Sequence, residues 1–384
     1  MFTRTVFLEE HEMFRDQVRR FVETEIVPQH SQWEEDGRVS REAWLKAGEN
    51  GLLCPTVPEA YGGAGADFLY SAVIMEELAR VGAMGPGFNL HSDIVAPYLM
   101  HYGTDDQKKQ WLPKMVSGEV IGALGMTEPS AGSDVQSIKT TAIRDGDEFV
   151  INGQKVFITN GGNCDLLVLA CKTDPSEGAR GTSLILVPAS TSGFTKGKLL
   201  KKVGWKAQDT AELFFENVRV PVTNLLGDDG RGFYLMMEQL PQERLLQCIR
   251  AVSTLEAALD WTVEHVTQRS AFGQTISDFQ NTRFKLAETK AECTMLRVFV
   301  DKCIEMHVAG QLDDKDAAMG KMLTTEFLCK RLDDLLQMFG GYGYMWEYPI
   351  ARAWADARVT RIAGGTGEIM REIISRSLLR SRNA

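Results

Sequence analysis

The sequence lacks clustered cysteines. Its seven cysteines are odd in number and widely spread, with no CxxC pair and no His-Cys cluster at zinc spacing. This pattern excludes a disulfide scaffold and a zinc ribbon, and it is typical of free thiols in a reducing compartment. A cytoplasmic location is therefore expected.

Positive charge and long apolar runs are also scarce. The 42 Lys and Arg residues are outnumbered by 52 Asp and Glu residues, and the net charge is −10. Nucleic-acid binding, which needs clustered basic residues, is not expected. No apolar run approaches the roughly 18–20 residues of a membrane span. The early acidic pair Glu9-Glu10 argues against a signal or transit peptide. A mitochondrial matrix enzyme whose transit peptide has been removed remains an alternative.

Motifs of common enzyme classes are missing as well. There is no Walker loop, nucleophile elbow or HExxH sequence. The Gly- and Pro-rich stretch at 52–67 loosely resembles a dinucleotide fingerprint, but no strand leads into it. We expect a loop there, and no metal site anywhere.

The patterns that are present divide the chain into three parts. Residues 1–120 predict helices: apolar residues recur at three- and four-residue spacing from Phe14 to Val22, and Pro28 is expected to end that helix. An amphipathic helix is predicted at 68–81, and another helix at 104–118 after the favourable start Thr104.

Short β-prone runs fill 121–232 and long helical patterns fill 233–384. Turn chemistry predicts hairpins at Asp145-Gly146-Asp147 and at Asn152-Gly153. Helices are predicted from 233 onward and near 281–310, 314–339 and 366–380. The predicted fold is α+β with three domains: a helical domain at 1–120, an antiparallel β-barrel or sandwich at 121–232, and a four-helix bundle at 233–384.

Two loops could contact a ligand. In MTEPSAGSDV at 126–135, Thr127, Ser130 and Ser133 supply hydroxyls, and Gly132 permits close backbone approach. Such a loop suits a flat heteroaromatic ring or a phosphate, but alone it also fits an ordinary polar loop. In QRSAFGQTISDFQ at 268–280, Arg269 can pair with a pyrophosphate and Phe272 offers an aromatic wall.

Two further segments allow a plain structural interpretation. Glu243 precedes Arg244 at the expected start of the first bundle helix, where an acid commonly interacts with the helix dipole. Six glycines within 337–371 would each cost a helix about 0.5–1 kcal/mol. They predict either a tight connection between helices or backbone lying against a ligand.

Four ordered motifs carry a family resemblance: MTEPSAGSDV (126–135), NGQKVFITNG (152–161), QRSAFGQTISDFQ (268–280) and the glycine-rich segment 337–371. With them the chain resembles the acyl-CoA dehydrogenases over essentially its whole length. WKAQDTAELFFE (205–216), LPQERLL (240–246) and YGYMWEYPIA (342–351) are most similar to the long-chain branch. The resemblance implies an acyl-CoA substrate, one FAD per subunit, an electron-transferring flavoprotein as acceptor, and a homotetramer built as a dimer of dimers.

The resemblance also implies roles for individual residues. Residues 124–133 would line the flavin, with Thr127 at the isoalloxazine edge and Ser133 nearer the CoA, and 157–159 would cover the ring's other side. Residues of the last two motifs would hold the FAD of a neighbouring subunit. The implied FAD-binding residues are Leu124, Gly125, Met126, Thr127, Gly132, Ser133, Phe157, Ile158, Thr159, Arg269, Phe272, Gln280, Gln337, Gly340, Gly341, Thr366 and Glu368.

One departure determines the expected mechanism. Many family members carry the catalytic glutamate where this chain has Gly364, whereas the long-chain and isovaleryl branches take it from a Glu-Arg pair in a bundle helix. Glu243-Arg244 matches that pair, so Glu243 is the expected α-proton acceptor. Burial should raise its pKa, and Arg244 should oppose this and so point away, toward the CoA. The Glu243 backbone N–H and a flavin hydroxyl are expected to bond the thioester carbonyl.

The expected substrate contacts are Ser133, Tyr234, Gln242, Arg244, Gly364 and Gly365. The branch resemblance favours long straight acyl chains, with isovaleryl- or citronellyl-type branched chains as the alternative. An acyl-CoA oxidase usually has a longer chain, and a nitroalkane oxidase would use Asp as base. A non-catalytic scaffold that binds CoA or a protein partner is the alternative from another class.

Overall fold

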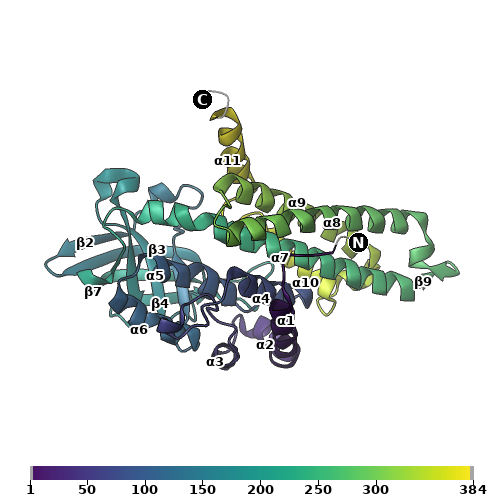
Figure 1. Cartoon of the computed structure of the whole chain (residues 1–384), viewed down its shortest axis with the longest axis horizontal. Helices are drawn as coiled ribbons and strands as arrows, with labels where there is room; N and C mark the ends of the chain where they lie inside the picture. Colours follow the sequence, from purple (N-terminus) through teal and green to yellow (C-terminus); the bar gives the residue numbers. More distant parts are fainter. Residues whose placement is uncertain (1–2, 381–384) are drawn as a thin grey trace.

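The computed structural model describes residues 3–380. The strands of the eight-stranded sheet gather at one side of the molecule, and α8, α9 and α10 occupy the other, with the small strand β9 at its far tip (Figure 1). Helices α1–α3 lie along one edge, and α11 carries the C-terminal end away from the body (Figure 1). Residues 1, 2 and 381–384, which belong to the predicted first and third domains, lie outside the described residues.

The first part is helical, as predicted. Its elements are α1 (Glu9–Phe21), η1 (Val22–Ile26), α2 (Val27–Asp36), α3 (Arg41–Glu49), η2 (Glu59–Tyr61), α4 (Phe68–Arg80), η3 (Leu90–Val95), α5 (Ala96–Tyr102) and α6 (Asp105–Val116). The expected end at Pro28 is wrong: this proline lies in the first turn of α2, after the π-helical turn η1. The helix runs on through the proline, which cannot donate a backbone hydrogen bond, directly after a turn that is widened to π-helical spacing. The stretch at 52–67 is a loop, as predicted, apart from the short 3₁₀ turn η2.

Helices α4 and α6 follow the predicted bounds closely. Helix α6 begins with a capping box, in which Thr104 Oγ1 accepts from the Gln107 N–H at 3.2 Å and Gln107 Oε1 accepts from the Thr104 N–H at 3.0 Å. The prediction that α4 is amphipathic is wrong. The helix packs between α1 and α7 and is therefore buried on nearly all sides.

The middle part is one sheet in the order β6-β7-β3-β2-β4-β5-β8, with β1 paired to β4. Its strands are β1 (Gly122–Gly125), β2 (Thr141–Asp145), β3 (Glu148–Thr159), β4 (Leu166–Lys172), β5 (Thr182–Pro188), β6 (Phe194–Leu199), β7 (Thr210–Pro221) and β8 (Leu225–Leu226). The 3₁₀ turns are η4 (Val135–Ser137), η5 (Pro175–Gly181) and η6 (Val222–Asn224). The sheet is antiparallel except at β4, which pairs with β1 and β2 in parallel.

One of the two predicted hairpins is present. Asp145 lies opposite Glu148 across the β2–β3 turn, where Gly146 has φ 64°. The predicted hairpin at Asn152-Gly153 is wrong, because both residues lie inside β3 and the chain continues along the same partner, β7. Gly153 has φ 146° and lies opposite a bulge of β7, and an added Cβ at this position would lie only 2.5 Å from Thr140 Oγ1.

The last part is helical and centres on α7. Its elements are α7 (Gly232–Gln268), β9 (Ser270–Ala271), β10 (Gln274–Thr275), η7 (Ile276–Asp278), α8 (Gln280–Val308), α9 (Asp314–Met338), η8 (Gly340–Tyr344), α10 (Pro349–Thr360) and α11 (Gly367–Arg380). Helix α7 packs against α8, α9 and α10 and also against α4 of the first part. Helix α10 was not predicted; it occupies the middle of the glycine-rich segment.

Two predictions concern chemistry outside the site. All seven cysteines are free, as predicted. Among residues 3–380, no helix combines the length and apolar character needed to cross a membrane.

Candidate active site

Glu243 lies inside α7, and the expectation that it begins the helix is wrong. The helix starts at Gly232, so Glu243 follows about three turns later, and Pro241 lies in the helix interior. An acid so far from the N-terminus gains little from the helix dipole. An interaction with the helix dipole therefore does not explain Glu243.

The Glu243 carboxyl is buried and bonded to one side chain. The residue is 8% exposed, and its Oε1 accepts from the Tyr98 hydroxyl of α5 at 3.3 Å. Burial raises the pKa of Glu243 to about 7, opposed by the Tyr98 hydrogen bond and by the charge of Arg244. The predicted shift and the predicted opposition by Arg244 are both confirmed. A carboxyl that titrates near neutrality can act as a general base.

Arg244 directs its charge to α9 rather than to Glu243. Its Nη1 donates to the carboxylate of Asp314, the first residue of α9, and the side chain is buried. The expectation that it points away from Glu243 is confirmed, but the partner is Asp314. A contact between Arg244 and CoA stays a prediction.

The glycines at 364 and 365 lie beside a buried lysine of α9. Lys321 Nζ donates to the Gly365 carbonyl at 2.5 Å, and burial lowers the pKa of Lys321 to about 8. Gly364 has φ 69°, and an added Cβ would lie 3.6 Å from Lys321 Cε. Any other residue at 364 would be strained by its left-handed backbone.

A second group of residues forms where the loop at 126–135 meets β3. The Val156 N–H donates to the Thr127 carbonyl at 3.0 Å. Lys155 Nζ donates to the Met126 carbonyl at 2.9 Å and to Glu128 Oε1 at 2.8 Å. The buried Glu128–Lys155 ion pair thus fixes the loop on the strand. Sequence reasoning missed this pair because no local pattern connects the two residues.

Phe157 is the most unusual residue of this group. It lies within a bulge of β3 between Lys155 and Ile158, has φ 61° and is 66% exposed. A bulky residue with positive φ is an outlier that commonly marks a functional site. Ile158 is instead buried in the sheet core, so its side chain cannot cover a ring and only its backbone remains available. Thr159 is half-buried.

The rest of the group fits a flat ligand. Leu124 is half-buried, and Gly125 packs against Leu167 and Leu169 of β4. Gly132 and Ser133 are exposed, and an added Cβ at Gly132 would meet no atom within 4 Å. Open backbone in this loop, and an exposed aromatic side chain on the strand bonded to it, are suited to the edge and face of an isoalloxazine ring.

The third group lies at the opposite end of the molecule, near the tip formed by β9 (Figure 1). Phe272 is 96% exposed with φ 54°, and Arg269 Cζ lies 5.7 Å from the Tyr342 ring centroid. The exposed members are Arg269, Phe272, Gln280, Gln337, Gly340 and Gly341. One chain does not bring them to the loop at 126–135. That these residues contact the FAD of a neighbouring subunit stays a prediction.

The remaining predicted contacts lie at the start of α11 and on α7. Thr366 Oγ1 accepts from the Ile369 N–H at 3.4 Å at the start of α11, and Glu368 is exposed. Tyr234 is partly exposed beside Arg231, whose Cζ lies 5.0 Å from its ring centroid. Gln242 Nε2 donates to the Asp93 carbonyl at 2.6 Å.

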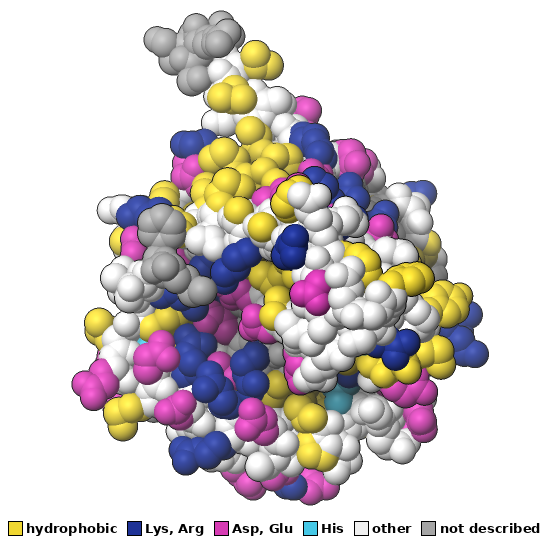
Figure 2. All heavy atoms as spheres, turned by 90° about the vertical axis from the view of Figure 1, so that its right-hand side faces the viewer, with side chains coloured by type: hydrophobic (Ala, Val, Ile, Leu, Met, Phe, Trp, Pro, Cys, Tyr) yellow, Lys and Arg dark blue, Asp and Glu magenta, His cyan; other side chains and the backbone are white. Residues whose placement is uncertain are grey.

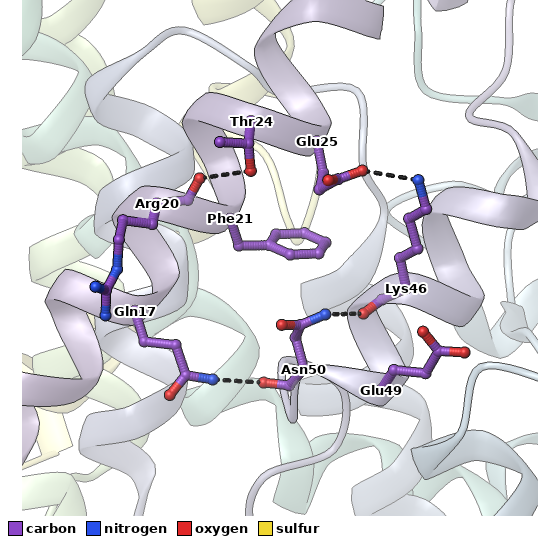
Figure 3. A pocket seen from close by; sticks show the side chains of 8 residues that line it. All are labelled: Gln17, Arg20, Phe21, Thr24, Glu25, Lys46, Glu49 and Asn50. Carbon is purple, nitrogen blue, oxygen red and sulfur yellow. Dashed lines mark hydrogen bonds and ion pairs between the residues drawn. The ribbon is translucent and has the colours of Figure 1, made fainter.

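A surface hollow between α1 and α3 contains none of these residues. It is lined by Gln17, Arg20, Phe21, Thr24, Glu25, Lys46, Glu49 and Asn50 (Figure 3). Its polar groups bond to one another: Gln17 Nε2 donates to the Asn50 carbonyl at 2.9 Å, and Lys46 pairs with Glu25 at 2.9 Å (Figure 3). These bonds make it a contact between helices rather than a site.

Comparison with known proteins covers nearly the whole chain. Residues 8–119, 123–218 and 230–379 match the models of the N-terminal, middle and C-terminal domains of acyl-CoA dehydrogenase. The chain is 47% identical to the mitochondrial long-chain specific acyl-CoA dehydrogenase of Sus scrofa, over 99% of this chain and 89% of that protein.

Solved structures agree. An acyl-CoA dehydrogenase of Geobacillus kaustophilus matches with a TM-score of 0.96 and 50% identity, over 98% of this chain and 100% of that one. A chain from the structure of the electron transferring flavoprotein of Acidaminococcus fermentans matches with a TM-score of 0.93 and 35% identity, over 97% of this chain and 99% of that one.

Proposed function

The chain belongs to the acyl-CoA dehydrogenase family, and from this premise we propose that it removes two hydrogens from the α and β carbons of an acyl-CoA thioester, with Glu243 as the α-proton acceptor and FAD as the hydride acceptor. The product is the trans-2-enoyl-CoA. The observation that carries the proposal is the buried Glu243 carboxyl, whose pKa is raised to about 7.

The base matches the reaction. An α-proton of a thioester is weakly acidic, so a carboxylate with an ordinary pKa would be a poor acceptor. A carboxylate whose pKa is raised by burial binds the proton more strongly, and with a pKa of about 7 roughly half of it is still ionised at pH 7. In the transition state, Glu243 takes up the α-proton while negative charge develops on the thioester oxygen.

That oxygen needs hydrogen-bond donors. The Glu243 N–H, expected for this role, is unsuitable because a residue inside α7 uses its N–H in the helix. The N–H groups of Gly364 and Gly365 are better candidates: within residues 3–380 neither donates to another protein group. We propose that they face the thioester oxygen, and that Lys321 fixes their loop through the Gly365 carbonyl.

FAD would lie along the loop at 126–135 and β3. When bound, it supplies the acceptor for the hydride that leaves the β carbon. Thr127, held by Val156, would bond the ring edge, and Phe157 would cover one face. Arg269 and the glycines at 340 and 341 would contact the FAD of a second subunit.

Replacing Phe157 by Ala tests the ring-covering role. Phe157→Ala should lower the affinity for FAD about 2- to 12-fold, since an aromatic contact contributes about 0.5–1.5 kcal/mol beyond its buried area. The fold should be unaffected because the side chain is mostly exposed. FAD binding to the apoprotein, followed by flavin fluorescence, measures the change. Phe214→Ala, at another partly exposed aromatic residue of the sheet, should leave FAD affinity unchanged; an equal loss in both variants would contradict the assignment.

We propose long straight acyl chains as substrates, supported by the long-chain specific relative. Branched chains of the isovaleryl or citronellyl type are the alternative. We further propose that electrons pass to an electron-transferring flavoprotein, and that the reaction belongs to fatty-acid β-oxidation. The matched structure of that name supports this partner.

We propose that each chain has domains at 1–120, 121–232 and 233–384. We further propose that four chains form a homotetramer, a dimer of dimers. One exposed face of α8 is mainly apolar and forms a shallow hollow. The hollow is lined by Ala287, Lys290, Ala291, Thr294, Met295 and Val298. Hydrophobic side chains also gather near the C-terminal end of the face seen in Figure 2. Burial of such surfaces favours association.

The cytoplasm stays the expected location, with the mitochondrial matrix as the alternative because the pig relative is mitochondrial.

Anaerobic titration of the purified flavoprotein with straight and branched acyl-CoAs tests the function. Bleaching of the flavin's visible band by an acyl-CoA is the expected result, and the order of chains identifies the preference. A bound flavin that no acyl-CoA bleaches would contradict the proposal and favour a non-catalytic scaffold.

A further inference from the structure

Helix α5 presents polar side chains to α7 at successive turns. Tyr98 and Tyr102 are four residues apart and therefore share one face of α5. The Tyr98 hydroxyl donates to Glu243 at 3.3 Å, and the Tyr102 hydroxyl donates to Glu238 at 2.9 Å. The two tyrosines bond acids five residues apart on α7, so the pairing of the helices is defined at both turns.

A second contact fixes α7 one residue before Glu243. Pro97 has no N–H, so the Asp93 carbonyl lacks the donor that an α-helix would place four residues later. Gln242 Nε2 donates to this carbonyl at 2.6 Å. The Asp93 carboxylate is itself held in place by Ser71 Oγ at 2.5 Å and Asn89 Nδ2 at 2.9 Å. The turn before Tyr98 is thus anchored to α4 and to the residue next to Glu243.

Tyr98 is the neutral donor among the groups around Glu243. It is fully buried, and burial together with the Glu243 charge raises its pKa well above the usual value. It therefore keeps its proton at neutral pH and can only donate to the carboxylate.

Charged and titratable groups on the elements packed around Glu243 have other partners. Among them are Arg244 of α7, bonded to Asp314 of α9; Lys321 of α9, bonded to Gly365; Asp93 of η3, bonded to Ser71 and Asn89; and Tyr102 and His101 of α5, bonded to Glu238 and Gln239.

We propose that Tyr98 is the positioning residue of Glu243: its hydroxyl fixes the orientation of the carboxyl group and favours the ionised form that accepts a proton. The role as positioning residue rests on the proposed function of Glu243 as base, but the hydrogen bond and its effect on ionisation do not depend on the acyl chain used. The Gln242–Asp93 bond keeps the two helices at the spacing that this contact needs.

The change Tyr98→Phe should raise the pKa of Glu243 by about one unit. A donor to a carboxylate stabilises its ionised form, so removing the donor makes the group easier to protonate. A shift of one pKa unit lies at the lower end of the effect of a hydrogen bond to a charged group. A small effect is expected because this bond is long, at 3.3 Å. Well below pH 7, the wild-type pKa of Glu243, the ionised fraction and hence the rate of flavin bleaching should fall about 10-fold.

Infrared difference spectroscopy of the FAD-loaded enzyme over a pH series measures this directly, because a protonated carboxyl has its own band. The band that disappears in Glu243→Gln identifies Glu243. In Tyr98→Phe its midpoint should move to higher pH by about one unit. Tyr102→Phe is the matched control: it removes a hydroxyl one turn away that bonds Glu238, and the midpoint should stay in place.

The outcomes separate this proposal from the proposed function. An unchanged midpoint in Tyr98→Phe, or the same shift in Tyr102→Phe, would overturn the role of Tyr98. A shift confined to Tyr98→Phe supports it. If that shift is accompanied by a bleaching rate that follows the new midpoint, both proposals are supported. If the shift occurs but no acyl-CoA bleaches the flavin, the Tyr98 contact stands and dehydrogenation fails.

Discussion

Glu243→Gln should lower the rate of flavin reduction by an acyl-CoA by about 10²–10⁴-fold, the usual contribution of a general base. The amide has the shape of the carboxyl group but cannot accept the α-proton. Because the carboxyl is buried in α7 and titrates near pH 7, a neutral amide replaces it without creating a new buried charge. The flavin spectrum and the melting temperature should therefore stay close to those of the wild type. Anaerobic stopped-flow mixing with a bleaching acyl-CoA measures the rate.

Glu238→Gln is the matched control for this experiment. Glu238 lies on the same helix, is exposed, and bonds Tyr102 rather than Tyr98. Its replacement should leave the bleaching rate within about 3-fold of wild type, since it touches no group assigned to the reaction. Near-normal bleaching by Glu243→Gln would show that another residue takes the proton.

Glu76→Gln should destabilise the protein by about 3 kcal/mol. Glu76 of α4 is buried and accepts hydrogen bonds from Arg4, Arg15 and Arg297 at 2.8–3.1 Å. Burial opposes its ionisation, but these guanidinium groups outweigh burial and lower the pKa of Glu76 from 4.5 to about 2. The pKa difference of about 2.5 units corresponds to roughly 3 kcal/mol, and Gln mimics the protonated form. Equilibrium unfolding in urea at pH 7 measures the loss.

The stabilisation by Glu76 should depend on pH in one direction. A carboxyl with a lowered pKa stabilises the folded state above its unfolded pKa, near 4.5 for Glu76, and loses this effect as pH falls through about 2. The difference between wild type and Glu76→Gln should therefore shrink from about pH 5 downward. Glu148→Gln, which breaks an exposed pair with Arg219, should cost no more than about 1 kcal/mol. A Glu76→Gln loss as small as this would contradict the assigned network.

Local sequence signals predicted the elements that depend on local chemistry. Thr104 before an acidic turn predicted the start of α6, and Asp145-Gly146 predicted the β2–β3 hairpin, because capping and positive φ act within a few residues. Asn152-Gly153 carries the same signal but lies inside β3 opposite a bulge of β7, and the strand pairing with β7 before and after it overrides the turn. Pro241 did not end or begin a helix, since α7 is packed along its length by four other helices.

The site depends on contacts between distant residues, which periodicity does not report. Tyr98 and Glu243 are 145 residues apart, and Gln242 and Asp93 are 149 apart. Spacing alone favoured a helix-dipole role for Glu243, and the family resemblance was needed to suggest a base. The structure then contributed the burial and the tyrosine partner. The positive φ of Phe157 likewise follows from the bulge and the loop bonded to it.

Exchange of the substrate's α-hydrogen with solvent tests the central claim most directly. A bleaching acyl-CoA is incubated anaerobically in D₂O with the wild type, Glu238→Gln or Glu243→Gln, and recovered substrate is analysed by mass spectrometry. The account predicts deuterium at the α carbon with the wild type and Glu238→Gln, and none with Glu243→Gln. Equal deuterium with Glu243→Gln would contradict the assignment of Glu243 as the group that takes the proton.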